Sequence, residues 1–313
     1  MKKIKKALNK MHLRKLPHSN HGVVGIVVAV LLIGLLVSVV SILQAVYIPK
    51  WMEEREAEHI EQVLVQFSEL KLAIDTHSVN RENNTPIATS ITLGSKEFPF
   101  LMSTRAYGSL EIVDNVCTIN INYNTTWNNT HNFNVSKSRG YKLGIIKYTS
   151  YNAYYIPQEK QSFVYEAGSV ITNQTSGNSI SVRPSFKPSK PSPSLKRISF
   201  KIIDIESYAE KTSYGGYDIV PILTEYNGSA YNDSINYENA KVRFINITSS
   251  DYSDAWFTFL NSTLKKEGFI YGYGNDYFIS PGNTIVLEFY NNLPEFELTL
   301  MGINAQIGPG WVE

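Results

Sequence analysis

The chain has 313 residues, which is enough for one or two domains with a sizeable core. Its formal net charge is only +1, but residues 1–22 carry seven basic residues and no acidic one, so residues 50–313 carry a net charge of −6. A mildly acidic body argues against a protein that binds nucleic acid, because contacts with phosphates need a basic face.

The first predicted element is a basic leader, residues 1–22, and the second is an apolar segment. From Val23 to Val46 there are 24 residues without a charge. A helix of this length is about 36 Å long, enough to cross a hydrocarbon core of roughly 30 Å. A cleaved signal peptide has a shorter apolar region, and the alternative of a buried core helix is disfavoured because the segment is apolar on every side. We therefore predict a transmembrane helix over residues 23–48, lying in the lipid bilayer.

The charges around this segment predict its direction. Positive residues flank the cytoplasmic end of a membrane span, which places residues 1–22 in the cytoplasm and the chain after Lys50 outside. Tyr47 and Trp51 stand where an aromatic belt would meet the membrane interface. We expect a single-pass protein of the cell membrane with an extracellular C-terminal part, the ectodomain.

An amphipathic helix is predicted next, over residues 49–78. Its apolar residues follow the spacing of one helical face; they are Ile60, Val63, Leu64, Phe67, Leu70 and Ile74. Pro49 either kinks one long helix or begins the second one. Glu53 to Glu58 would favour a helix start, and His59 among glutamates suggests metal ligands but is better explained as part of a solvated face.

The remaining chain is strand-like, with short runs rich in Ile, Val, Tyr, Phe and Thr between turn residues. We predict a β-rich lobe over residues 79–183, a Pro/Ser-rich linker over 184–195, and a second β-rich lobe over 196–313. The expected fold class is α+β: a long N-terminal helix followed by a mostly antiparallel, sandwich-like ectodomain. Composition leaves open whether the two lobes are one domain or two.

One helix is expected inside the second lobe, near residues 251–267. Ser or Asp would cap its start, Gly268 would cap its end, and Trp256 would anchor its aromatic side in the core. The following stretch, "GYGNDYF", is predicted as a turn between aromatic strands, with a calcium or sugar site as the alternative. The single cysteine, Cys117, alternates with polar residues and is predicted to be a buried strand residue.

Nine Asn-x-Ser/Thr acceptors for N-glycosylation follow the apolar segment, and all of them fall on the side predicted to be extracellular. They are Asn83, Asn124, Asn128, Asn134, Asn173, Asn227, Asn232, Asn246 and Asn261. An Asn- and Ser-rich surface also produces such patterns by composition, but the topology favours glycosylation of several of them.

Catalytic and cofactor motifs are missing from the sequence. No HExxH, GxSxG, P-loop or GxGxxG pattern occurs, and one cysteine cannot form a CxxC metal site. We therefore expect no enzyme activity, no cofactor, no metal site and no nucleic-acid partner.

The order of these parts resembles a known family. A basic leader, a hydrophobic half-helix, an amphipathic half-helix and a β-rich head form the plan of type IV pilin-like proteins. The stretches "KWMEEREAEHIEQVLVQFSELKLAID", "KLGIIKYTSYNAYYIPQEKQSFVYEAG" and "DYSDAWFTFLNSTLKKEGF" look like those of archaeal pilin-like and archaellin-like surface proteins. The resemblance covers most of the chain after residue 20.

The resemblance implies cleavage by a prepilin peptidase between Gly22 and Val23, although His21 replaces the usual Lys or Arg and the apolar segment lacks an early glutamate. It also implies self-association, or association with other pilin-like subunits, through the N-terminal helix. The expected function is a non-enzymatic, glycosylated cell-surface protein, anchored or assembled through this helix. The alternative is a membrane-anchored adhesin or glycan-binding ectodomain that forms no filament.

Overall fold

The computed structural model describes residues 21–83, 85–96, 105–127, 133–155, 160–208, 213–228, 234–235, 240–249, 251–291 and 293–308. By the density of its internal contacts the chain divides into two compact units, one ending at Trp51 and the other beginning at Met52. We describe each unit by itself and call the second one the β domain.

The first unit is helical. Helix α1 covers His21–Ile42, a π-helical turn covers Leu43–Tyr47, and α2 begins at Ile48. The N–H of Ile48 donates to the carbonyl of Leu43, which is the wider bond of a π turn. Pro49, the next residue, has no N–H to donate and crowds the carbonyl four residues earlier, which gives this turn a physical cause. The helix predicted over residues 23–48 is thus confirmed.

Helix α2, Ile48–Asn80, buries one face in the β domain. Five of the six residues of the predicted apolar stripe are buried, and Leu64 is half-buried. Because the chain is already helical upstream, Glu53 to Glu58 do not lie at a helix start, and that part of the sequence interpretation is wrong. The solvated face expected around His59 is wrong as well, because both Glu56 and His59 are buried.

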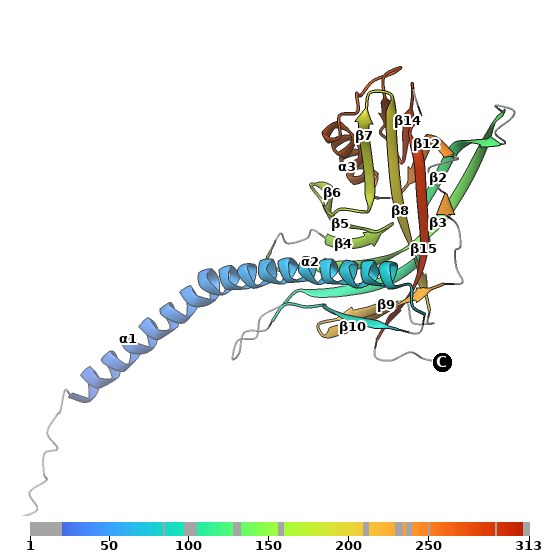
Figure 1. Cartoon of the computed structure of the whole chain (residues 1–313). Coiled ribbons are helices and arrows are strands. Elements are labelled where there is room, and N and C mark those ends of the chain that lie inside the picture. The colour runs from blue at the N-terminus through green and yellow to red at the C-terminus, as the bar shows by residue number, and fades with distance from the viewer. Residues whose placement is uncertain are drawn as a thin grey trace, which may run out of the picture. The chain divides into compact units, whose positions relative to one another are not determined.

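The β domain is one curled sheet, which with α2 confirms the α+β class (Figure 1). The sheet order is β1-β10-β15-β12-β2-β3-β4-β5-β6, and the other strands pair at its sides. Pairing is antiparallel except between β8 and β15. The strands are β1 Ile87–Thr92, β2 Tyr107–Trp127, β3 Phe133–Tyr151, β4 Lys160–Glu166, β5 Ser169–Gln174, β6 Gly177–Val182, β7 Phe186–Ser192, β8 Leu195–Ser207, β9 Ser213–Gly216, β10 Ile219–Asn227, β11 Ser234–Ile235, β12 Ala240–Thr248, β13 Tyr277–Ser280, β14 Thr284–Phe289 and β15 Glu295–Ile307.

Two hydrophobic cores lie on opposite faces of this sheet. The first packs α2 against Ile146 of β3 and Ile203 of β8, and the second packs helix α3, Ser253–Lys266, against Ile145 and Ile202 of the same strands. Neighbouring residues of a strand point to opposite faces, so the central strands are covered on both sides. This explains why six of the seven residues of β4 are buried. Figure 1 shows α2 along the sheet and α3 in a separate place, beside β6 and β7.

The structure differs from the predicted division at residues 184–195. This segment is no linker: β7 pairs with β8 in an antiparallel hairpin, and Phe186 and Pro188 are buried. The prolines at 188 and 191 suggested a linker in the sequence. Among the described strands β7 pairs with β8 alone, so it is an edge strand, and an edge strand tolerates proline. Each core contains residues from both predicted lobes, so the two lobes are not separate packing units.

Smaller differences concern element ends. The strand predicted around Cys117 is part of the longer strand β2, which has a bulge between Val113 and Cys117. Of the two aromatic strands predicted on either side of "GYGNDYF", the second is β13, whereas Tyr271 before this stretch forms only an isolated bridge to Tyr277. Helix α3 matches the helix predicted near 251–267 and ends before Gly268, whose φ is +78°, but its start at Tyr252 has no side-chain cap.

Candidate functional site

The most unusual surface of the first unit is α1 itself. Every described side chain from Val24 to Ile42 is exposed, and an 18-residue window of this helix has a mean hydropathy of 3.2. By length and composition this helix is able to cross a membrane, as an anchor or a signal does. A helix that is apolar on all sides needs lipid or protein around it.

Helix α2 has a second apolar surface on the side away from its core. Val65, Leu72 and Val79 are spaced by seven residues and are 57%, 66% and 76% exposed. Residues seven apart lie on nearly the same side of a helix, so these three form one stripe, which we call the heptad stripe. The same side is acidic nearer the start of the helix, where Glu54, Glu58 and Glu61 are exposed. The sequence interpretation recognised only the buried face.

Glu56 holds the first part of α2 to the sheet. Its carboxylate accepts backbone N–H bonds from Ala153, Tyr154 and Tyr155 at 3.0, 2.8 and 2.6 Å. The side chain is fully buried, and the three donors follow β3 directly. Charge-assisted bonds of this kind are stronger than neutral ones, so Glu56 fixes both the helix and this loop.

His59, one turn further, is bonded through Tyr148. The Tyr148 hydroxyl donates a hydrogen bond to the carbonyl of Leu93 at 2.8 Å. Because the hydroxyl has only one hydrogen, it accepts the hydrogen bond from Nε2–H of His59 at 2.9 Å. Burial lowers the pKa of His59 to about 4, partly offset by the Leu93 carbonyl. The imidazole is therefore neutral at physiological pH and serves as a buried donor.

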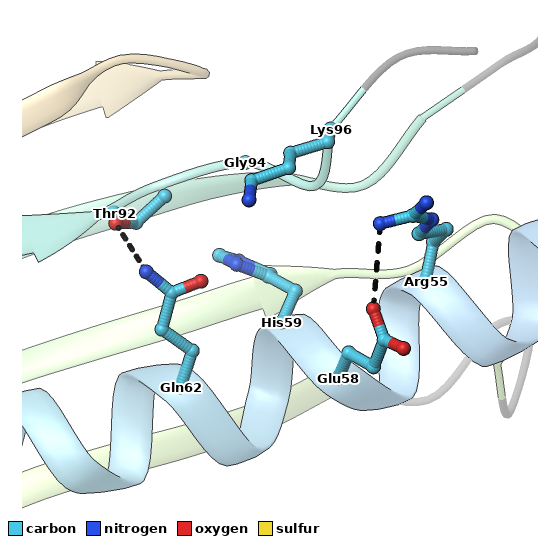
Figure 2. Close-up of a pocket in the computed structure, with 7 residues that line it drawn as sticks. All are labelled: Arg55, Glu58, His59, Gln62, Thr92, Gly94 and Lys96. Atoms are coloured by element: carbon cyan, nitrogen blue, oxygen red, sulfur yellow. Dashed lines mark hydrogen bonds and ion pairs between the residues drawn. The ribbon is translucent and has the colours of Figure 1, made fainter.

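A small hollow lies beside this histidine, between α2 and the end of β1 (Figure 2). Gln62 donates to the hydroxyl of Thr92 at 3.3 Å, and Arg55 forms an ion pair with Glu58 at 3.5 Å. The remaining lining residues are Gly94 and Lys96. The volume is about 40 Å³, far below the roughly 150 Å³ of a cavity that binds benzene, so the hollow has no room for an organic substrate.

The other helix is held by a second buried carboxylate, Glu166, at the end of β4. It accepts from the indole N–H of Trp256 at 2.7 Å and from the hydroxyl of Ser249 at 3.1 Å. Burial raises its pKa to about 7, against the lowering effect of these donors. Trp256 is fully buried, as predicted. The sequence interpretation missed Glu166, although an acidic residue at the end of the apolar run "SFVYE" could have indicated a buried carboxylate.

Cys117 packs into the same region and is buried, as predicted. Burial first, and the charge of Glu166 second, raise the pKa of its thiol well above the ordinary value. Within the described parts of the chain, no group of three or more His, Cys, Asp or Glu residues is placed to hold a metal ion.

The glycosylation acceptors differ in environment. Asn83 is exposed, and Asn261 lies half-buried on α3, where it accepts a bond from the Tyr277 hydroxyl at 2.8 Å. The amide nitrogen of Asn227 instead donates to Glu206 and to Asn304. The other half-buried acceptors lie within strands; they are Asn124, Asn173 and Asn246. Asn128, Asn232 and the side chain of Asn134 lie outside the described residues.

The predicted cleavage point lies inside a helix. Gly22 and Val23 belong to the first turn of α1, which begins at His21. Residues 1–20 of the predicted leader lie outside the described residues.

Comparisons of this chain with models of protein families, with curated proteins and with solved structures find no match. The functional conclusion must therefore come from the surfaces described above.

Proposed function

We propose that this chain is a non-enzymatic, pilin-like surface protein, anchored in the cell membrane or assembled with other subunits through residues 23–46. The observation that carries the proposal is the pair of uncovered apolar surfaces on successive helices, α1 and the heptad stripe of α2. The β domain would lie outside the cell and the leader in the cytoplasm, as the basic residues of the leader predict.

The two apolar surfaces suit different partners. An all-apolar helix is covered equally well by lipid tails or by other apolar helices. A stripe with seven-residue spacing beside charged residues is typical of one helix packing against another. Removal of a basic leader would let α1 pack among copies of itself, and the stripe would add a second contact along α2. Permanent anchoring without assembly would leave the stripe without a partner.

Cleavage of the leader can be tested directly by mass spectrometry of N-terminal peptides from the membrane and the surface fractions. A mature form beginning at Val23 together with filaments in electron micrographs would support the pilin-like function. Only full-length N-termini and no filaments would instead support the second candidate, an anchored adhesin or glycan-binding protein. Protease digestion of the leader from outside intact cells would contradict the orientation.

The stripe is tested with the variant Leu72→Glu. Leu72 is 66% exposed, so the substitution should change the stability of the isolated chain by less than about 0.5 kcal/mol. We expect the amount of assembled protein, measured by cross-linking and by sedimentation, to fall at least tenfold. Ser138→Glu adds the same charge at an exposed position of β3 and is the matched control. Equal assembly of both variants would contradict a role of the stripe.

Glycosylation is part of the proposal and has its own readout. The exposed Asn83 should carry a glycan, whereas the amide nitrogen of Asn227 is already engaged in the folded domain. Intact-protein and peptide masses of the surface form would measure occupancy. Unmodified masses at all nine acceptors would end this part of the proposal.

A further inference from the structure

A group of aromatic side chains lies on the surface beyond the end of α3. Tyr273 is 75% exposed and contacts Phe278 with ring centroids 4.2 Å apart. Tyr271 is 41% exposed and stacks on Phe278 at 5.6 Å, and Tyr290 lies 5.9 Å from Tyr273. We call these four residues the aromatic platform. Tyr273 and Phe278 belong to the "GYGNDYF" stretch, Tyr271 immediately precedes it, and Tyr290 follows β14.

The loop that carries the platform is held by its own backbone bonds. Gly272 donates to the carbonyl of Tyr277 at 2.9 Å, and Asn275 bonds to the carbonyls of Gly272 and Tyr271. Gly274 has a φ of +75°, in the left-handed region that favours glycine. These bonds hold the stretch that the sequence predicted as a turn in one defined loop.

An ionic group that includes the buried Lys196 holds the same loop to the domain. Asp276 accepts from the backbone N–H of Ile270 at 2.9 Å and forms ion pairs with Lys190 at 2.7 Å and Lys196 at 2.8 Å. The side chain of Lys196 is only 1% exposed, and it also donates to the backbone carbonyls of Tyr290 and Asn291. One lysine thus joins both segments that carry platform residues.

The burial of Lys196 beneath the platform bears on ligand binding. Burying a lysine costs free energy of desolvation, and ion pairs with one carboxylate recover only part of it. The ion pairs of Asp276 and the bonds from Lys196 hold the exposed rings in a fixed geometry before a ligand binds. This reduces the conformational entropy lost on binding. Exposed aromatic residues that only cover a core need no such support.

The size and the charges of the platform narrow the choice of ligand. At about 200 Å² per ring, the exposed part is roughly 300 Å², well below the roughly 800 Å² per partner of a stable protein interface. Lys265 already lies 5.3 Å from the ring of Tyr271, which disfavours a cationic ligand. Two of the nearby cations are paired with Asp276, and Arg243 lies 3.9 Å from Glu288, so these charges are not arranged for a nucleic-acid backbone.

We propose that the aromatic platform binds glycans: the C–H face of a pyranose ring packs on Tyr273 and Tyr271, and its hydroxyl groups bond to the polar side chains beside them. A sugar ring has one apolar face and a hydrated rim, which matches rings that stand on an open surface instead of in a pocket. Glu288, Arg243 and Asn275 border the platform and supply acceptors and donors for hydroxyls. The site does not depend on anchoring or assembly, so it adds an activity to the pilin-like function and gives the second candidate, a glycan-binding protein, a specific site.

The test uses the full chain, solubilised in detergent, so that assembly plays no part. Soluble oligosaccharides of glucose, mannose and N-acetylglucosamine are titrated, with binding followed by calorimetry and by saturation-transfer NMR on the sugar protons. We expect binding to at least one of them, weakened at least tenfold in Tyr273→Ala and kept within threefold in Tyr273→Phe. The matched control is Tyr107→Ala, because Tyr107 is also exposed, at 45%, and stacks on Tyr151 elsewhere in the domain.

The outcomes separate the proposal from its competitors. Binding of any of the sugars that Tyr273→Ala abolishes and Tyr107→Ala leaves unchanged supports it. No binding by any of the three sugar series overturns it. Binding of an oligothymidine in place of the sugars, lost in Tyr273→Ala, also overturns it and assigns the platform to single-stranded nucleic acid. Far-ultraviolet circular dichroism of each variant verifies that the fold is intact.

Discussion

Helices α2 and α3 are held against opposite faces of one sheet, and each contact contains a buried ionisable group, but the two groups respond to pH in opposite directions. Burial lowers the pKa of His59 under α2 to about 4 and raises the pKa of Glu166 under α3 to about 7. Both contacts therefore favour the neutral form of a titratable side chain. The contributions of these two groups to the pH dependence of stability are therefore large and opposed in sign.

The signs follow from proton binding in the folded and the unfolded chain. Between about pH 4.5 and 7 the folded chain keeps the proton of Glu166 and the unfolded chain has lost it, so the stability from this group is full below pH 4.5 and falls as pH rises. Between about pH 4 and 6.5 only the unfolded chain protonates His59, so the stability from this group is lost as pH falls. Over the shared range the two slopes oppose each other.

The largest expected effect breaks the α2 contact without touching either titration. Glu56→Ala removes the acceptor of three backbone N–H groups, and we expect the free energy of unfolding to drop by roughly 4 kcal/mol. Urea unfolding of the detergent-solubilised chain, followed by near-ultraviolet circular dichroism, measures it. Glu54→Ala, at an exposed position of the same helix, should cost less than about 0.5 kcal/mol. Equal losses in the two variants would mean that the loop after β3 finds other acceptors.

The next variant, Glu166→Gln, removes the titration of Glu166, so that the contribution of His59 to the pH dependence of stability can be measured alone. Glu166→Gln keeps an oxygen for the indole of Trp256 and offers an amide to Ser249, so the fold should survive. Without Glu166, stability should rise with pH between 4.5 and 6.5 instead of staying flat. Relative to the original chain, the variant should gain about 3 kcal/mol on going from pH 4.5 to pH 7.5, the size of a shift from 4.5 to about 7. Parallel pH profiles of variant and original chain would exclude Glu166 as a titrating group.

The converse variant, His59→Gln, should give the opposite slope. Gln can reach Tyr148 with an amide N–H in place of Nε2, and it carries no charge at any pH. Stability should then fall as pH rises from 4.5 to 6.5, by about 2 kcal/mol relative to the original chain. The effect is smaller than for Glu166→Gln because the pH interval is narrower, while the two pKa shifts are about equal in size. A profile that stays flat in this variant would show that Glu166 titrates near its ordinary pKa.

The sequence predicted most of the helices and strands because their patterns are local. The stripe from Ile60 to Ile74, the alternation around Cys117 and the Gly268 terminus of α3 depend only on near neighbours in the chain. The buried charges escaped prediction because their partners are distant. Glu56 bonds to Ala153, Glu166 to Trp256 and Lys196 to Asp276, and no spacing rule relates such pairs. The strand β7 was missed for a related reason, since an edge position permits the prolines that suggested a linker.

The smallest expected effect concerns the access of a reagent to the buried region around Glu166. Cys117 is fully buried, and burial together with the charge of Glu166 raises the pKa of its thiol well above the ordinary value, so the reactive thiolate is suppressed twice over. In the native chain, iodoacetamide at pH 8 should leave Cys117 unmodified for hours, and in urea it should modify it completely, as intact mass shows. Glu166→Gln removes the charge but keeps the burial, so native labelling should stay slow. Fast labelling of this variant alone would mean that the carboxylate, and not the packing around α3, protects the thiol.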